Sequence, residues 1–519
     1  MKKRNVLFLA VSMGIMMTAC GKGSEPKTTN EGGNAEVKEH VITIQSNSDS
    51  GNLNPYALNT NATPIVANIY ESLWIQTDGE TEWKLATGIE ETDDLNVYYI
   101  HLREGVTFSN GDPFHADDVI FSLKTAITSP TSASGSYFER VVDMDKTVAE
   151  DDYTVKLVFR EFDCAWKGYF KQLYIVNAET YNEEESVSKP MGTGPYILTS
   201  YQVGTGAEMI KNENWWQGVP EIDKVIVKSI DEDPQITTAL ESGQLDVSYL
   251  APTADLSYLD SLEQFSVFEQ AIPKSNLVYF NMNEGSAFEN VDARAAVCYA
   301  IDNQAIIDTV YQGLGVPSTN YFSVAAADYQ KEYEDYSDVY GKTGADLEKA
   351  RELLEKSGMA GKDIVLAVQS TATYKAEAEV VQAALKEIGF GDVQILAIDN
   401  SSFMVSLNDM SLWDIAIMSF TNSSEMGLYT ADSLFNEVWP SITWPGKEAF
   451  FEKMHDATRS VDETERAAKM QEVVREFEEN IYWYNIFDLS YGYVYNVDIE
   501  NFRVYSSSRL IPIGEFSLK

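Results

Sequence analysis

Residues 99–119 read YIHLREGVTFSNGDPFHADDV and carry three local structural signals in succession. The residues before Ser109 alternate between apolar and polar side chains, which is typical of a half-buried β-strand, and we expect this strand over 94–108. Ser109 to Asp112 predict a tight turn, because Asn-Gly pairs favour such turns. A helix then starts at Asp117 or a neighbour, since apolar residues follow at helical spacing.

The sequence on both sides of this stretch predicts further short elements. Val41–Ile44 has the composition of a strand, and the polar loop over 46–64 that follows contains glycine and proline. A helix is expected from Val66 to Leu73, because its apolar residues share one helical face. Residues 155–159 alternate as another strand.

The second half of the chain alternates between helices and strands. A helix between two strands implies a right-handed crossover connection, and hence a parallel or mixed sheet. The fold class is therefore α/β. The expected elements are helices over 346–356 (stopped by Gly358), 374–388 (stopped by Gly389) and 462–481, with strands over 364–368, 393–398, 413–418 and, rich in aromatic residues, within 482–504.

The composition restricts the kinds of partner. The chain has 519 residues with 38 Lys and Arg against 81 Asp and Glu, a formal net charge of −43. A hydrophobic share of 44% argues against disorder and predicts about three domains or one large multi-lobed body. Nucleic acid and anionic lipid surfaces attract basic proteins, so the acidic surplus excludes nucleic acid as a partner and argues against docking on anionic lipid. The 12% aromatic share predicts aromatic cores or ligand clefts.

The amino-terminal segment has the pattern of an export signal. Three basic residues at 2–4 precede an apolar stretch over 6–17 that is too short to span a bilayer. The residues MTAC that end at Cys20 resemble the bacterial lipoprotein box, which implies a signal peptide over 1–19 and lipidation of Cys20. The alternative is an ordinary signal peptide with an incidental cysteine. Residues 20–40 then form a flexible tether, because they are rich in small and polar residues.

The sequence carries no catalytic or metal-binding motif. Its 4 histidines are not spaced as helix-borne metal ligands, and neither a Cys-x-x-Cys pair nor a Gly-x-Ser-x-Gly elbow is present. Acidic clusters such as 91–94 resemble the paired carboxylates of glycosidases, but 81 acidic residues produce such pairs by chance. Cys164 and Cys298 are expected to be buried thiols rather than a disulfide. We therefore expect no enzymatic activity, no metal and no cofactor.

Five segments of the chain resemble the motifs of one protein family. They are the stretch at 99–119, NIYESL with TDG over 68–79, GTGPY over 192–196, AID over 300–302 with Gly313 and Pro317, and WDIAI over 413–417. Together they resemble the peptide/nickel class of solute-binding lipoproteins that serve ABC importers, known as extracellular solute-binding protein family 5. The first of these segments is the most specific match.

The resemblance implies a two-lobed periplasmic-binding-protein-like fold of type II, with an extra subdomain in the first lobe. Two strands, at 277–281 and 482–489, would join the lobes and serve as the hinge. The implied ranges are 41–60, 175–275 and 490–519 for the base lobe, 61–174 for the extra subdomain and 276–489 for the second lobe.

The resemblance also implies a function without bond breaking. A protein of this kind closes its lobes around a solute, here a short peptide or peptide-like molecule, and delivers it to the membrane subunits of an ABC importer. It would be a monomer at the extracytoplasmic face of the bacterial cell membrane. The lipid on Cys20 would be its membrane contact.

The resemblance places candidate solute-binding residues in three parts of the chain. Asn59 and Asn61 lie in the loop with which oligopeptide-binding relatives contact the bound backbone. Tyr137 falls, within a residue or so, where these relatives place a ligand-facing tyrosine, and Phe420 falls where they carry a tryptophan. For each of these residues the alternative is an ordinary loop or core position.

The sequence departs from those relatives just after Phe420. Peptide-binding relatives carry there an aspartate that pairs with the α-amine of the ligand, whereas this chain reads TNSSE over 421–425. Either Glu425 reaches the amine instead, or the ligand is a neutral or hydroxyl-rich solute that Asn422 and Ser423 hold against Phe420.

Three other functions stay open at this point. The first is a receptor for an oligosaccharide or a nickel complex, although the scarcity of histidine disfavours the metal. The second is an exported hydrolase with paired carboxylates, which would show turnover. The third is a membrane-tethered adhesin or folding helper, which would bind no small molecule.

Overall fold

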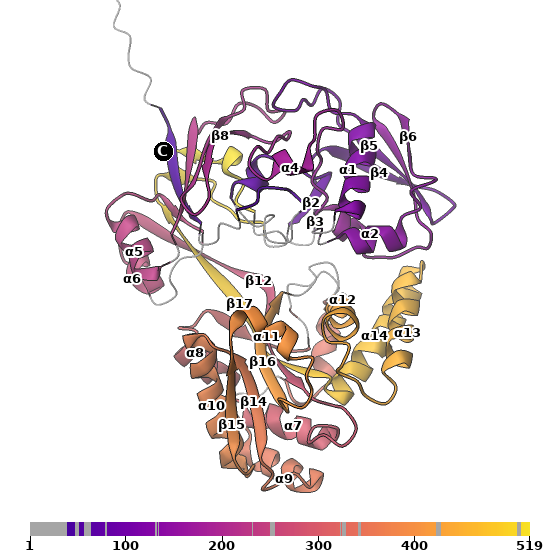
Figure 1. Ribbon diagram of the computed structural model, residues 1–519, viewed down its shortest axis with the longest axis vertical. Helices are drawn as coiled ribbons and strands as arrows, with labels where there is room; N and C mark the ends of the chain where they lie inside the picture. The colour runs from indigo at the N-terminus through magenta and orange to yellow at the C-terminus, as the bar shows by residue number, and fades with distance from the viewer. Residues whose placement is uncertain are drawn as a thin grey trace, which may run out of the picture. The chain divides into compact units, whose positions relative to one another are not determined.

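One mixed sheet connects the two halves of the chain. The computed structural model describes residues 39–46, 51–56, 64–77, 80–129, 132, 134–230, 232–249, 255–321, 323, 329–340, 344–421, 427–505 and 510–519. In this part of the chain the sheet has eleven strands, in the order β15-β14-β16-β12-β17-β11-β1-β10-β9-β8, with β13 paired to β17. Figure 1 shows β12 and β17 running between the two groups of elements.

Strands β1 and β8–β11 form the part of the sheet that we call the base of the first lobe. β1 is parallel to β10 and β11, and β9 and β8 continue the sheet in antiparallel order. The expected strand at 41–44 is confirmed, and it buries the alternate residues Ile42 and Ile44. The elements are β1 (Val41–Ser46), β8 (Tyr196–Gln202), β9 (Gly206–Lys211), β10 (Lys224–Ser229), α5 (Asp233–Glu241), β11 (Val247–Ser248), α6 (Leu256–Asp260), β18 (Ile499–Glu500) and β19 (Ser517–Leu518).

A four-stranded antiparallel sheet forms the subdomain, in the order β4-β5-β7-β6. The expected helix after the Asn-Gly turn is confirmed as α1. A capping box stabilises its start, in which the His115 backbone N–H donates to the Asp118 carboxylate at 2.8 Å. The elements are β2 (Trp74–Thr77), β3 (Glu80–Trp83), β4 (Ala86–Glu91), β5 (Val97–Leu102), α1 (Ala116–Thr128), α2 (Gly135–Val141), β6 (Val148–Asp151), β7 (Thr154–Val158), α3 (Trp166–Phe170) and α4 (Glu183–Ser186).

Strands β14–β16 and helices α7–α14 form the second lobe. β14 is parallel to both β15 and β16, so the predicted helix–strand order and parallel pairing are confirmed. Gly358 and Gly389 end α9 and α10 in the left-handed conformation, at φ 75° and 114°. The elements are α7 (Val291–Ala300), α8 (Asn303–Val310), β13 (Gly315–Pro317), α9 (Leu347–Ser357), β14 (Ile364–Gln369), α10 (Ala372–Ile388), β15 (Val393–Ile398), α11 (Asn400–Ser406), β16 (Ile415–Thr421), α12 (Gly427–Asp432), α13 (Lys447–Arg459) and α14 (Glu463–Asn480).

β12 (Phe265–Phe280) and β17 (Trp483–Asn496), which we call the crossing strands, belong to both lobes. They pair with each other in antiparallel register, while β12 also pairs with β16 and β17 also pairs with β11. Their register shifts between Ala271 and Ser275 and again between Asn276 and Leu277. Such irregularities bend a strand, so the two strands are bent where they pass from one lobe to the other.

The buried apolar side chains form separate cores. One core takes residues from Leu277 to Leu489, together with Ala165 of the subdomain. Another combines the base and the subdomain, from Ile42 to Phe516. This grouping is compatible with the implied lobe ranges, which remain a prediction.

The prediction of a helix from Val66 to Leu73 is wrong. The structure has only a single 3-10 turn, Val66–Asn68, followed by β2. The backbone carbonyls of this segment accept hydrogen bonds from distant N–H groups: Ile69 from Gly194, Glu71 from Ile175 and Leu73 from Lys84, at 2.9 to 3.0 Å. Tertiary hydrogen bonds thus replace the bonds that a helix would make.

Candidate functional site

The predicted binding residues divide into described and undescribed ones. Asn59, Asn61, Asn422, Ser423 and Glu425 lie outside the described residues, as do Cys20 and the rest of the chain up to residue 38. Tyr137 and Phe420 are described, the first on α2 of the subdomain and the second on β16 of the second lobe.

Tyr137 is buried, with 5% of its surface exposed, and its ring stacks on Tyr169 with centroids 3.5 Å apart. Its hydroxyl oxygen has no hydrogen-bond partner among the described residues. Burial, followed by the nearby Asp163 carboxylate, raises the pKa of the Tyr137 hydroxyl well above its ordinary value. The hydroxyl therefore stays protonated at neutral pH and is able to donate one hydrogen bond.

The structure brings Tyr137 close to α12 of the second lobe. The ring of Tyr429 on α12 meets the Tyr137 ring edge-on at 6.5 Å, and Tyr429 lies only four positions after the predicted Glu425. Phe420 is half-buried against the core of the second lobe and stands opposite Ser275 in the β12–β16 pairing. The two described candidates therefore lie on different lobes, one beside α12 and one beside a crossing strand.

A buried polar cluster joins the crossing strands next to Phe420. Ser275 Oγ donates to Asp488 Oδ1 at 2.8 Å, and Asn485 Nδ2 donates to both of these oxygens at 3.1 Å. All three residues are at most 2% exposed. Buried polar groups are costly unless hydrogen-bonded, so the cluster fixes the pairing of the two strands beside the register shift.

A buried carboxylate of the second lobe contacts the next residue of β12. Glu377 Oε2 on α10 accepts hydrogen bonds from Asn276 Nδ2 at 3.0 Å and from the Tyr311 hydroxyl at 2.8 Å. Its other oxygen, Oε1, is buried and has no partner among the described residues. Burial raises the pKa of Glu377 to about 7, although both hydrogen bonds oppose that rise. This carboxylate therefore titrates near neutral pH.

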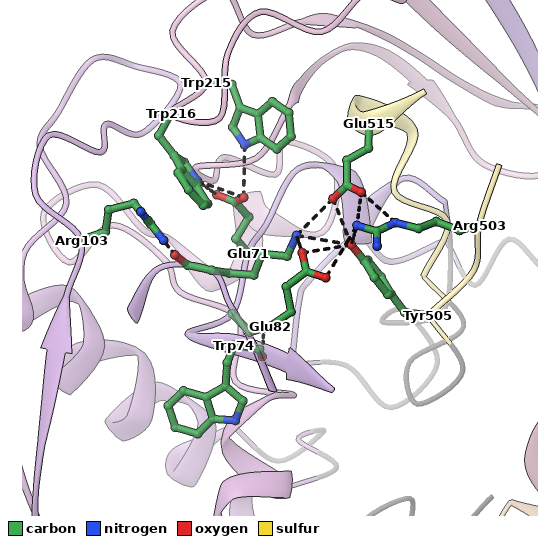
Figure 2. Close-up of polar contacts among 11 residues, drawn as sticks. Glu71, Trp74, Glu82, Arg103, Trp215, Trp216, Arg503, Tyr505 and Glu515 are labelled. Carbon is green, nitrogen blue, oxygen red and sulfur yellow. Dashed lines mark hydrogen bonds and ion pairs between the residues drawn. The ribbon is translucent and has the colours of Figure 1, made fainter. Parts of the chain in front are cut away.

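The first lobe holds another buried carboxylate, Glu71, which Figure 2 shows beside the indole rings of Trp215 and Trp216. Its oxygens accept hydrogen bonds from Thr193 Oγ1 at 2.7 Å, Trp215 Nε1 at 3.1 Å and Trp216 Nε1 at 2.9 Å. Burial raises the pKa of Glu71, and the three donors counteract that rise. Glu71 thus joins three segments that are far apart in the sequence.

A cluster of charged residues lies next to Glu71 (Figure 2). Lys84 Nζ lies 2.6 Å from Glu82 and 3.1 Å from Glu515, and Arg503 pairs with Glu515. The pocket beside this cluster has a volume of about 50 Å³. Clefts that enclose small ligands hold roughly 300–1,000 Å³, so this pocket is too small for a peptide. The cluster holds the carboxyl-terminal segment against the subdomain.

Sequence reasoning did not identify Glu71, Glu377, Asp488 or Tyr429. A signal existed for Glu71 alone, because it lies in the 68–73 motif and its partner Thr193 lies in the GTGPY motif. The contact gives a physical reason for both motifs: one supplies the acceptor and the other the donor.

Further features concern metals, membranes and cysteines. Among the described residues no group of three or more His, Cys, Asp and Glu side chains is arranged to hold a metal ion. In that same part of the chain, every helix is too short or too polar to cross a membrane.

Cys298 is buried, Cys164 is partly buried, and they form no disulfide with each other, as expected.

Comparisons with known proteins point to one family. The model described as "Bacterial extracellular solute-binding proteins, family 5 Middle" matches residues 80–438. Heme-binding protein A of Haemophilus influenzae is 28% identical over 304 residues, 54% of each chain. Di/tripeptide-binding protein 3 of Pseudomonas aeruginosa is 30% identical over 339 residues, 59% of this chain and 62% of the relative. The matched regions thus span little more than half the length of these curated relatives.

Solved structures share the fold over nearly the whole chain. The ABC transporter substrate binding protein CtaP of Listeria monocytogenes superposes with a TM-score of 0.82, 19% identity and coverage of 92% of this chain and 99% of that chain. The oligopeptide-binding protein AppA of Bacillus subtilis, solved with a nonapeptide, gives 0.73 and 19% over 93% and 99%. The expected two-lobed mixed α/β fold is confirmed. The matched proteins are solute-binding proteins and not enzymes, in agreement with the missing catalytic motifs.

Proposed function

Because this chain belongs to the bacterial extracellular solute-binding proteins of family 5, we propose that it captures a peptide-like solute between its two lobes and delivers it to an ABC importer. The family match over residues 80–438 carries this proposal. The fold supports it, since two crossing strands shared by both lobes are suited to a hinge.

Solute capture requires contacts that exist only when the lobes are closed. A ligand shifts the population between open and closed forms only by its different affinity for them. A change from mostly open to mostly closed needs about 5.5 kcal/mol of that difference. A few desolvated hydrogen bonds and one stacked aromatic ring supply this amount.

The proposed solute site combines residues from both lobes. Tyr137 contributes a protonated hydroxyl from the subdomain and Phe420 an apolar ring from the second lobe. The other proposed contacts come from the loop with Asn59 and Asn61 and from Asn422, Ser423 and Glu425. In this arrangement Glu425 binds the α-amine of the solute in place of the missing aspartate.

A peptide is the preferred solute class. The relative with 30% identity is named for di- and tripeptides, and the one with 28% for heme. A nickel-binding periplasmic protein of Escherichia coli also matches, at 25% identity over 69% of this chain and 71% of that protein. Solute classes thus differ within the family, and a nickel complex or an oligosaccharide is the alternative cargo.

The proposal includes a lipid anchor on Cys20, a tether and a monomer at the extracytoplasmic face of the cell membrane. Mass spectrometry of the amino-terminal peptide tests the anchor. We expect a diacylglyceryl-modified Cys20 as the first residue, and Cys20→Ala should release the protein into the medium. An unmodified amino terminus on the membrane-bound protein would contradict the anchor.

The function is tested by native mass spectrometry of the purified protein, followed by calorimetry with the compound that co-purifies. We expect peptides of two to five residues. Tyr137→Phe should weaken their binding by about tenfold, because it removes one hydrogen bond and keeps the ring. Tyr196→Phe, whose hydroxyl binds the Ile222 carbonyl inside the first lobe, is the matched control. A sugar or a metal chelate would overturn the peptide assignment, and turnover of any bound compound would overturn the whole proposal.

A further inference from the structure

The subdomain and the second lobe contact each other away from the strand pairing of the sheet. The Tyr429 hydroxyl on α12 donates a hydrogen bond of 2.6 Å to Asp163 Oδ2, which lies just before α3. Both residues are buried, with 5% and 3% of their surface exposed. The bond joins residues 266 positions apart in the sequence.

Two further polar contacts flank this bond. The backbone N–H of Cys164 donates to the Thr458 carbonyl at 3.0 Å, and Arg459 Nε lies 3.2 Å from Glu161 Oε2. The ion pair is about half exposed and contributes little to stability. The backbone hydrogen bond exists only while the subdomain and the second lobe are in contact, so its N–H group is a probe of that contact. Residues 161–164 of the subdomain thus contact α12 and the end of α13.

Apolar packing supports the same contact. The Tyr429 ring meets both Tyr137 and Tyr169 edge-on, with centroids 6.5 and 6.1 Å away. Ala165 of the subdomain is buried within the core of the second lobe. The centre of the contact is therefore buried and packed on apolar side chains.

The charge of Asp163 makes the Tyr429 bond important. Asp163 Oδ1 accepts from the Ala165 backbone N–H at 3.0 Å, and Arg140 Nη1 lies 3.6 Å from Oδ2, beyond hydrogen-bond distance. Without the Tyr429 hydroxyl, Oδ2 would be a buried carboxylate oxygen with no donor within hydrogen-bond distance among the described residues. Water would replace that donor only if the lobes separated.

We propose that Asp163 and Tyr429 form a latch between the subdomain and the second lobe, which holds the lobes together and must break before they separate. This inference rests on the proposed function, because it assigns the latch to solute retention. Tyr429 then acts as a positioning residue: it acts through Asp163 and needs no contact with the solute. Hydrogen bonds of 2.6 and 3.0 Å are lost when the partners move apart by about 1 Å, so lobe rotation breaks both.

Hydrogen–deuterium exchange of the Cys164 amide tests the latch in the protein as purified, with any solute that it carries. We expect Tyr429→Phe to accelerate this exchange by about tenfold, because the variant loses a charge-assisted hydrogen bond of the closed form. The amides of Gly194 and Ile364 serve as internal references, since they donate to Ile69 and Asp392 within one lobe each. Tyr196→Phe, which loses a buried hydrogen bond inside the first lobe, should leave the Cys164 exchange unchanged.

Unchanged Cys164 exchange in Tyr429→Phe would overturn the latch. If the amides of Cys164, Gly194 and Ile364 all exchange faster, the variant has lost stability as a whole. Asp163→Asn then tests the latch instead, because it keeps the size of the side chain and removes the charge. A selective acceleration at Cys164 in that variant supports the latch, and its absence overturns it. No peptide is added to any sample, so a chain that binds no peptide would refute the proposed function and leave this result standing.

Discussion

Two buried carboxylates, Glu71 in the first lobe and Glu377 in the second, differ in how completely they are hydrogen-bonded. Both oxygens of Glu71 accept donors, which come from Thr193, Trp215 and Trp216. Only one oxygen of Glu377 does so. One of its two donors is the side-chain amide of Asn276, a residue that lies at a register shift of a crossing strand. The comparison shows two roles for a buried carboxylate: Glu71 holds segments of one lobe together, whereas Glu377 is a titratable group at the proposed hinge.

The largest effect is expected for Glu71→Ala. The change leaves two indole N–H groups and one hydroxyl without their acceptor, and each buried unsatisfied donor costs roughly 1–3 kcal/mol. We expect the free energy of unfolding to fall by about 4 kcal/mol in urea titrations followed by circular dichroism. A fall in the free energy of unfolding below about 1 kcal/mol would show that Glu71 does not hold these segments of the first lobe together.

Glu377→Gln should have a smaller effect, and one that depends on pH. The folded pKa of about 7 lies above the ordinary value of 4.5, so the folded protein holds this proton more tightly than the unfolded chain does. Its contribution to stability is therefore complete below pH 4.5 and is lost as the pH rises towards 7.

The variant lacks this loss, because glutamine is neutral and still offers an oxygen to Asn276 and Tyr311. We expect equal stability of both proteins near pH 4, and a variant more stable by about 3 kcal/mol at pH 8. Unfolding titrations at both pH values measure the difference. Parallel pH profiles of wild type and variant would refute a neutral-pH titration of Glu377.

Tyr311→Phe should destabilise the protein at the same site. The hydroxyl donates to Glu377 at 2.8 Å, and hydrogen bonds to charged acceptors are stronger than those to neutral ones. We expect a loss of about 2 kcal/mol at pH 8 and about 1 kcal/mol at pH 5, measured by urea unfolding. The same loss at both values would mean that the charge on Glu377 does not change in this range.

The smallest effect is expected for a carboxylate at the surface. Glu208 on β9 lies 2.7 Å from Lys224 on β10, and the two side chains are 45% and 25% exposed. Glu208→Ala should cost less than about 1 kcal/mol, because solvent screens such pairs. A cost comparable to that of Glu71→Ala would remove the distinction between buried and exposed carboxylates.

The sequence predicted elements whose causes are local and missed those whose causes are distant. Helices α9 and α10 were found because Gly358 and Gly389 mark their ends and their apolar residues repeat within each helix. The segment at 66–73 was misjudged because its carbonyls bind N–H groups of residues such as Gly194 and Ile175. Local periodicity contains no information about such partners.

The candidate site shows the same division. The role of Tyr137 follows from a resemblance between sequences, and its contact with a solute stays a prediction. Asp163 and Tyr429 could not be paired from sequence, because 266 positions separate them and neither lies in a recognised motif. Glu377 has the ordinary appearance of a helix glutamate until the fold buries it against β12.

Small-angle X-ray scattering of the solute-free protein, before and after addition of a defined mixture of di-, tri- and oligopeptides, tests lobe closure most directly. A hinged receptor should become more compact, with a smaller radius of gyration, and the peptides should be recovered chemically intact. Superimposable scattering curves for peptides, sugars and metal chelates alike, or peptides recovered cleaved, would contradict capture of a solute by lobe closure.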